Sequence, residues 1–196
     1  LTYTQMLNRK GGIECDLTVA RMGEEEFYIV TGTGFATHDF DWISRNLSGD
    51  AHLSDITSSR AVLSLMGPQS RAILQRHSPD DLSNAAFPFG TARWISVAMC
   101  PVLALRVTYV GELGWELHMP TEVAATVYEA LMSGPDAPTL AGYRAIETLR
   151  LEKGYRAWGS DIGPDHTPVE AGLAWAVKMK SGVDFIGREA IAAQLG

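Results

Sequence analysis

The chain has 196 residues, of which 46% are hydrophobic, so it can bury roughly 70% of the surface that its unfolded form exposes. Sixteen Lys and Arg against 23 Asp and Glu give a net charge of −7, which opposes binding to nucleic acid or to an anionic membrane. No apolar run approaches the ~20 residues of a membrane span. Cys15 and Cys100 fit neither a zinc spacing nor a CxxC motif, so we expect a reducing, cytoplasmic setting.

Strict alternation of apolar and polar residues predicts the first clear strand. Its inward positions would be Ile13, Cys15, Leu17 and Val19. A second strand follows within residues 25–32, and acidic residues lie in the turn between the two. A helix over 38–47 comes next, because Phe40, Ile43 and Leu47 recur at helical spacing and would form its apolar side.

The rest of the chain mixes strands and helices without a regular β-α-β alternation. We expect short strands within 55–66, a helix over 68–77, strands within 92–99, 101–110 and 114–120, and helices over 121–132 and 142–154. The last three strands should be antiparallel, since their connections are too short for crossover helices. This order favours the α+β class over a doubly wound parallel sheet.

Standard cofactor and metal motifs are missing or incomplete. The segment GTGFAT (32–37) resembles a dinucleotide fingerprint, but Thr37 takes the third glycine position and the preceding strand belongs to a hairpin, so a turn into a helix is the better interpretation. The five histidines form no HxH or HExxH pair, and we predict no metal site. A GxSxG elbow and a phosphate-binding loop are also absent.

Polar residues on the outward faces of strands are the remaining candidates for chemistry. Asp16 points away from Cys15 and Leu17, and Glu116 points away from Trp115. Such carboxylates are usually solvated surface groups. If they instead line a cavity, Asp16 could act as a base and Glu116 could accept paired hydrogen bonds from a heterocycle. Tyr109 offers a ring and a hydroxyl close to Glu116 in the sequence.

Four segments together resemble one family, the tetrahydrofolate-binding aminomethyltransferases. They are TYTQMLNRKGGIECDLTV (2–19), YVGELGWELHMP (109–120), RAIETLRLEKGYRAWGSDIGPDHTPVEAGLAWAVK (144–178) and FIGREAI (185–191). The family includes the T-protein of the glycine cleavage system and the C-terminal half of dimethylglycine and sarcosine dehydrogenases. The segment GGIECDLTV, with a single Asp before its Leu, is similar to the dehydrogenase branch.

The resemblance implies roles for four residues. Asp16 matches the catalytic aspartate, and Tyr109 and Glu116 match the residues that hold the pterin ring. A pterin presents an amino group and a ring N–H side by side, and one carboxylate can accept both. Arg144, Arg150 and Arg156 are candidates for the anionic folate tail. Arg144 is the nearest match to the family's folate-contacting arginine, although Ile146 stands at that position.

The resemblance also implies an architecture. We expect two ferredoxin-like antiparallel sheet units with covering helices, part of a three-subdomain folate-binding fold. Residues 1–196 would form one folate-binding domain that lacks the family's N-terminal start and C-terminal barrel. FAD would belong to a separate domain of the same polypeptide, and the lipoyl-bearing H-protein is the alternative partner. The compartment would be the mitochondrial matrix in a eukaryote.

Three functions remain open on the sequence. The first is one-carbon transfer that converts tetrahydrofolate to 5,10-methylenetetrahydrofolate, in the dehydrogenase branch or, as an alternative, in a T-protein. The second is a non-catalytic folate-binding module, which the absence of a cysteine after Cys100 disfavours, because those relatives carry a Lys-Gly-Cys stretch. The third is a structural or docking part of a larger protein.

Overall fold

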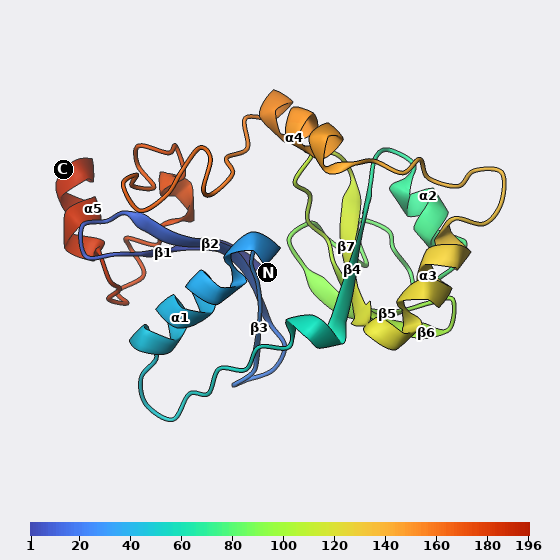
Figure 1. Ribbon diagram of the computed structural model, residues 1–196, viewed down its shortest axis with the longest axis horizontal. Helices are drawn as coiled ribbons and strands as arrows, with labels where there is room; N and C mark the ends of the chain where they lie inside the picture. The colour runs from blue at the N-terminus through green and yellow to red at the C-terminus, as the bar shows by residue number, and fades with distance from the viewer. The chain divides into compact units, whose positions relative to one another are not determined.

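The computed structural model describes residues 1–196, which form two compact units (Figure 1). The first unit comprises Leu1–Ser54 and Arg156–Gly196, and the second comprises Asp55–Tyr155. Each unit contains one antiparallel sheet with helices, which confirms the predicted α+β class with two antiparallel sheet units. None of the helices combines the length and the apolar character that crossing a membrane requires.

The sheet of the first unit is a three-stranded meander in the order β1-β2-β3. Its strands are β1 (Thr2–Leu7), β2 (Ile13–Arg21) and β3 (Phe27–Val30). The predicted alternation in β2 holds through Leu17, and then Ala20 rather than Val19 is buried. This change of phase falls where β3 pairs with Thr18–Arg21. The side chain of Asp16 therefore lies on the face opposite to Cys15, as predicted.

The segment 32–37 forms a turn into a helix, as the sequence indicated. Strand β3 pairs antiparallel with β2, and Thr33–Phe35 form a 3₁₀ turn that leads into α1 (Ala36–Asn46). The predicted apolar side is only partly buried: Ile43 is half-buried, Phe40 is 39% exposed, and Leu47, which follows the helix, is 40% exposed. The buried residue of α1 is Asp39, whose carboxylate accepts hydrogen bonds from the Thr31 hydroxyl and the His38 ring.

The C-terminal part of the first unit closes its core. Helix α5 (Arg188–Leu195) follows a long irregular segment that contains one 3₁₀ turn, η4 (Ala174–Ala176). Ile191 of α5 packs against the start of the sheet in a small cluster whose buried members are Leu7, Ile13, Ile162, Ala171, Leu173 and Ile191. Segments far apart in the sequence thus share one core.

The second unit is built on a four-stranded sheet in the order β4-β7-β6-β5. Its strands are β4 (Arg60–Met66), β5 (Ala92–Val97), β6 (Cys100–Leu105) and β7 (Gly114–Pro120). Its helices are α2 (Ser70–Gln75), α3 (Ala124–Leu131) and α4 (Tyr143–Glu152), and two 3₁₀ turns, η2 (Thr57–Ser59) and η3 (Thr121–Val123), precede β4 and α3. All strand pairs are antiparallel, as expected.

The helix order in the second unit refines the ferredoxin-like expectation. That motif runs β-α-β-β-α-β, whereas here the order through α3 is β-α-β-β-β-α. The loop between β6 and β7 spans only residues 106–113, so these strands form a hairpin and the second helix follows the last strand.

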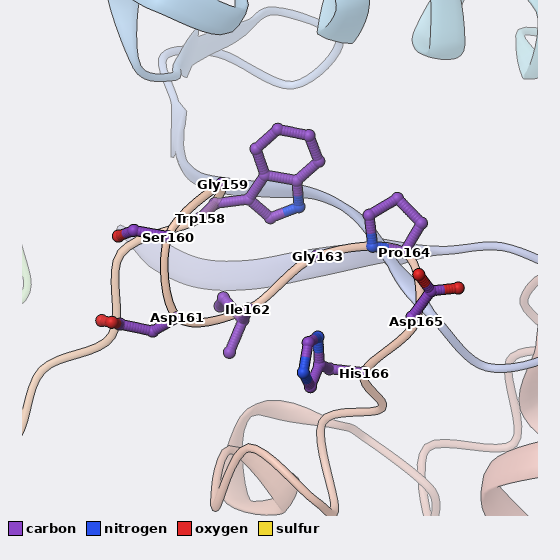
Figure 2. A pocket seen from close by; sticks show the side chains of 9 residues that line it. All are labelled: Trp158, Gly159, Ser160, Asp161, Ile162, Gly163, Pro164, Asp165 and His166. Carbon is purple, nitrogen blue, oxygen red and sulfur yellow. The ribbon is translucent and has the colours of Figure 1, made fainter.

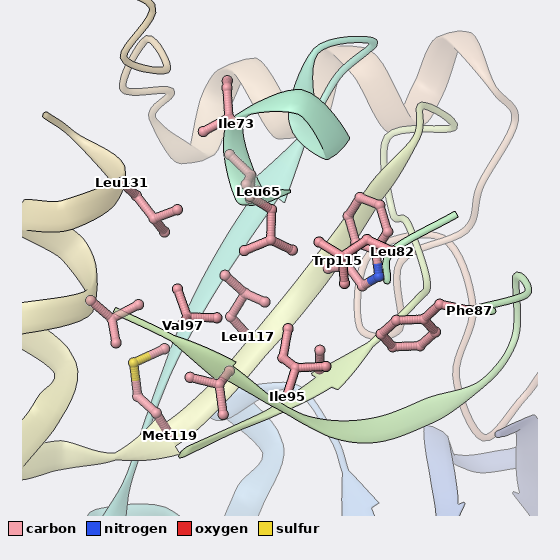
Figure 3. Packing of buried hydrophobic residues seen from close by; sticks show 14 residues of the cluster. Leu65, Ile73, Leu82, Phe87, Ile95, Val97, Trp115, Leu117, Met119 and Leu131 are labelled. Carbon is pink, nitrogen blue, oxygen red and sulfur yellow. The ribbon is translucent and has the colours of Figure 1, made fainter. Parts of the chain in front are cut away.

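One face of this sheet carries the main core of the second unit (Figure 3). Trp115, Leu117 and Met119 alternate along β7 and are fully buried. Ile73 and Leu74 of α2 and Val127 and Leu131 of α3 belong to the same cluster, so both helices cover that face. The intervening residues of β7, Glu116 and His118, therefore point to the other face.

Candidate functional site

Asp16 lies in the middle of the first unit's sheet and is held by two side chains of the neighbouring strand. Gln5 is its direct partner across β1 and β2, and Gln5 Nε2 donates to Asp16 Oδ1 at 3.0 Å. The side chain of Tyr3, two residues away on the same face of β1, also hydrogen-bonds this carboxylate. Tyr3 in turn stacks on Trp175, with ring centroids 5.7 Å apart. The carboxylate of Asp16 is thus fixed in place.

Burial sets the proton affinity of Asp16. Desolvation raises its pKa above the ordinary value of an aspartate, and the negative charge of Asp39 raises it further. The hydrogen bonds from Tyr3 and Gln5 act in the opposite direction, because they stabilise the ionised form. The net effect is a raised pKa, so Asp16 holds its proton more tightly than an exposed aspartate does.

A second polar cluster lies on the other face of β2, against α1. The Cys15 thiol, the His38 ring and the Asp39 carboxylate offer ligand atoms within 4.8 Å of one another. His38 Nδ1 is 2.9 Å from Asp39 Oδ1, and His38 Nε2 is 3.5 Å from Glu14 Oε2. The sequence prediction of no metal site missed this grouping, because Cys15 and His38 are distant in the sequence.

The hydrogen bonds of this cluster satisfy the buried Asp39 without a metal ion. Its carboxylate accepts from the Thr31 hydroxyl, the His38 ring and the Cys15 thiol. Burial first, and then the charge and hydrogen bond of Asp39, raise the pKa of Cys15, so its thiolate is strongly disfavoured. A metal ion would have to displace these protons, and we regard the cluster as a structural network that joins α1 to β2.

Glu116 lies in the second unit, on the face of β7 opposite to the core. Its side chain is 23% exposed, and its partners across the sheet are Ser64 and Leu105. The buried His118, two residues further along the same face, places Nε2 3.5 Å from Glu116 Oε2. Glu116 is therefore only partly accessible, unlike an ordinary solvated surface acid.

Tyr109 lies in the loop between β6 and β7, in the same unit as Glu116. Its ring stacks on that of Tyr155, with centroids 6.2 Å apart and planes inclined by 21°. Gly111, at a φ of +74°, brings the loop so close to α4 that a Cβ there would collide with the Lys153 side chain. Both tyrosines are 38% exposed, so part of this aromatic pair is open to solvent.

The three candidate arginines have different environments. Arg150 is fully buried in α4, where its guanidinium forms an ion pair with Glu147 and donates to the Tyr155 carbonyl at 2.7 Å. This supports a structural role for Arg150 rather than binding of the folate tail. Arg144, on the same helix, is exposed. Arg156 is exposed in the first unit and lies against Gly172, where a Cβ would be 3.0 Å from its Nη2.

A loop of the first unit lines a small, open pocket of about 200 Å³ (Figure 2). Its walls are formed by one continuous segment, Trp158–His166. This loop runs along the start of β2, because Ile13 N donates to the His166 carbonyl at 3.0 Å and Trp158 Nε1 donates to the Ile13 carbonyl at 2.8 Å. The loop thereby anchors the strand that carries Asp16.

The predicted site residues fall in both units. Asp16 lies in the first unit, and Tyr109, Glu116 and Arg144 lie in the second. Sequence reasoning missed Gln5 and Tyr3 as partners of Asp16, although both lie in the TYTQML segment, and it also missed the buried His118. Gln5 could have been predicted as the partner of Asp16 only if the register between β1 and β2 were already known.

Comparison with known proteins identifies the family. The sequence matches the GCVT N-terminal domain over residues 1–181, and the chain therefore belongs to that family. It is 43% identical to the mitochondrial sarcosine dehydrogenase of Homo sapiens over 98% of the chain. It is 39% identical to the mitochondrial dimethylglycine dehydrogenase of Mus musculus over 96% of the chain.

A solved structure is similar in fold and sequence. The glycine cleavage system aminomethyltransferase T from Bartonella henselae superimposes with a TM-score of 0.86 and 30% identity over 99% of this chain. These matches confirm the predicted family, including its dehydrogenase relatives. The chain spans 23% and 22% of the two dehydrogenases and 52% of the solved aminomethyltransferase chain.

Proposed function

We propose that the chain is a tetrahydrofolate-dependent one-carbon transfer domain of a protein like dimethylglycine or sarcosine dehydrogenase. The observation that supports this most directly is the geometry of Asp16. Its carboxylate has a raised pKa and is held by Gln5 and Tyr3 on the face of β2 opposite to Cys15, which supports a role in proton transfer. Burying a carboxylate costs free energy, so the stability of the fold does not explain why Asp16 is shielded from water.

The proposed reaction balances in atoms and charge. A folate nitrogen attacks the carbon of an iminium group, a new N–C bond forms, and the C=N electron pair moves to the donor nitrogen. The second folate nitrogen then displaces the donor amine and closes the methylene bridge. The two folate N–H protons leave with the amine, and Asp16 accepts and returns a proton during these steps. The product is 5,10-methylenetetrahydrofolate.

The binding roles belong to residues of the second unit. Glu116 would accept two hydrogen bonds from the amino group and ring N–H of the pterin, because its carboxylate is partly shielded and aligned by β7. Tyr109 would provide an aromatic surface for the pterin, backed by Tyr155. Arg144, exposed on α4, is our candidate for the anionic tail of the folate.

The source of the carbon follows from the relatives. In the dehydrogenase branch, FAD bound by a separate domain of the polypeptide would oxidise the amine to the iminium. The two dehydrogenases similar to this chain are mitochondrial proteins, so we propose the matrix if the source is eukaryotic and the cytoplasm otherwise.

Two alternative functions use the same fold. A glycine cleavage T-protein would take its carbon from an aminomethyl group on the lipoyl arm of the H-protein, and the similarity to the Bartonella henselae aminomethyltransferase favours it. A non-catalytic folate-binding module would keep Glu116 and Tyr109 but would not require Asp16. The effect of replacing Asp16 therefore distinguishes the enzyme from the binding module.

A titration with tetrahydrofolate tests the proposal. Wild type, Asp16→Asn and Glu116→Ala would be compared by calorimetry without oxygen, with Glu129→Ala on α3 as the matched control for loss of an exposed acid. We expect Glu116→Ala to weaken binding about tenfold or more, because a charge-assisted bond pair is lost. Asp16→Asn should bind nearly as well as wild type.

Turnover gives the decisive measurement for Asp16. In the full-length parent protein, we expect Asp16→Asn to abolish formation of 5,10-methylenetetrahydrofolate while folate binding persists. Equal turnover with and without the substitution would rule out the catalytic role of Asp16, whereas folate binding without turnover in the wild-type parent would favour the binding module. If wild type binds no folate, the proposed function of this chain is wrong.

A further inference from the structure

The Gln5 amide has one end bound and one end without a partner. Its Nε2 donates to Asp16 Oδ1 at 3.0 Å, while its carbonyl oxygen, Oε1, is buried and accepts no hydrogen bond within the chain. When Asp16 is ionised, its carboxylate only accepts hydrogen bonds, so the NH₂ group of Gln5 faces it. The Gln5 carbonyl then points away from Asp16 Oδ1.

Neighbouring residues hold this amide in place. Gln5 is the register partner of Asp16, and the two side chains share one face of the sheet. Tyr3, on the same face, binds the same carboxylate and is stacked on Trp175. A buried carbonyl without a donor is unfavourable, so a ligand that displaces what covers Oε1 and brings an N–H group to it would gain a bond.

We propose that Gln5 is a substrate-binding residue whose Oε1 accepts a hydrogen bond from an N–H of the reacting nitrogens of tetrahydrofolate, beside Asp16. This inference rests on the proposed function. In tetrahydrofolate, N5 and N10 are secondary amines, and each carries one hydrogen. In 5,10-methylenetetrahydrofolate both nitrogens are bonded to the bridging carbon and neither carries a hydrogen. Gln5 can therefore bind the substrate in this way but not the product.

This difference between substrate and product has a consequence for turnover. The bond to Gln5 exists before transfer and is lost when the methylene bridge closes, so it contributes to the affinity for tetrahydrofolate alone. With one folate N–H held by Gln5, the other reacting nitrogen is left to face the proton acceptor Asp16, and loss of the bond to Gln5 favours release of the product.

Binding of both folates to Gln5→Met tests the proposal. Methionine has nearly the same length and volume but cannot accept a strong hydrogen bond. We expect the Kd for tetrahydrofolate to rise about tenfold, as for loss of one hydrogen bond, and the Kd for 5,10-methylenetetrahydrofolate to change less than twofold. The exposed Gln69→Met in the second unit is the matched control, for which neither Kd should change.

Each other result overturns the inference. Equal weakening of both ligands would mean that Gln5 acts only by holding Asp16, and no weakening of either would mean that Oε1 faces no ligand. Retained product binding also shows that the variant is folded. If the wild-type chain binds neither folate, the proposed function itself is wrong. If the wild-type chain binds both folates and Gln5→Met binds them equally well, only the inference about Gln5 is wrong.

Discussion

Replacing Gly12 with alanine tests how the strand that carries Asp16 is anchored. Gly12 lies immediately before β2, where the chain passes the loop Trp158–His166. A Cβ on residue 12 would overlap the Pro164 carbonyl oxygen, and it would lie 2.7 Å from the Pro164 carbonyl carbon and 2.7 Å from Asn8 Nδ2. These neighbours are mainly backbone, so the loop must move away from β2.

The cost follows from the bonds that cross this contact. They are the bonds from Ile13 N to the His166 carbonyl at 3.0 Å, from Trp158 Nε1 to the Ile13 carbonyl at 2.8 Å, and from Asn8 Nδ2 to the Pro164 carbonyl at 3.2 Å. At about 1 kcal/mol each, their loss destabilises the first unit by about 3 kcal/mol. For a chain of this size, that lowers the Tm by roughly 6–12 °C.

Hydrogen exchange followed by mass spectrometry, together with thermal melting, measures this effect. Gly163→Ala is the matched control, since a Cβ at Gly163 meets nothing within 4 Å, although it lies in the same loop. Gly12→Ala should lose amide protection across the first unit and keep it across residues 55–155, while Gly163→Ala should match wild type. If Gly12→Ala and Gly163→Ala have the same Tm, the loop does not anchor β2 and our reasoning is refuted.

Two further predictions concern buried charges. Arg150→Met should destabilise the second unit by about 2–3 kcal/mol, because the bond to the Tyr155 carbonyl and the pair with Glu147 are lost, whereas Arg144→Ala should change stability by less than about 0.5 kcal/mol. Equal urea-unfolding midpoints for Arg150→Met and Arg144→Ala would contradict this prediction. The affinity for tetrahydrofolate should fall only in Arg144→Ala. Asp16→Asn should raise the Tm at pH 8, because folding raises the pKa of Asp16 and ionising the buried carboxylate above that pKa costs stability. This gain should shrink as the pH falls through the raised pKa toward the ordinary value, and a gain that grows at low pH would reverse the sign and refute the assignment.

Local sequence pattern accounts for most of the secondary structure. Alternation identified β2, and short polar connections identified the antiparallel run of β5, β6 and β7. The apolar pattern did not predict the buried side of α1, where Phe40 is exposed and Asp39 is buried. Helical spacing shows which residues share a side of a helix, but it does not show that Asp39 is buried with hydrogen bonds from Thr31 and Cys15, which lie outside the helix.

The candidate site divides in the same way. The order of motifs along the chain was enough to assign the family and to select Asp16, Tyr109, Glu116 and Arg144, because residue type and spacing are properties of the linear sequence. Strand register and burial are properties of the folded chain, and they decided that Gln5 faces Asp16, that Arg150 is engaged with Glu147 and Tyr155, and that His118 lies beside Glu116. Proton affinity and hydrogen-bond partners depend on distances between residues far apart in the sequence, and only the tertiary structure sets those distances.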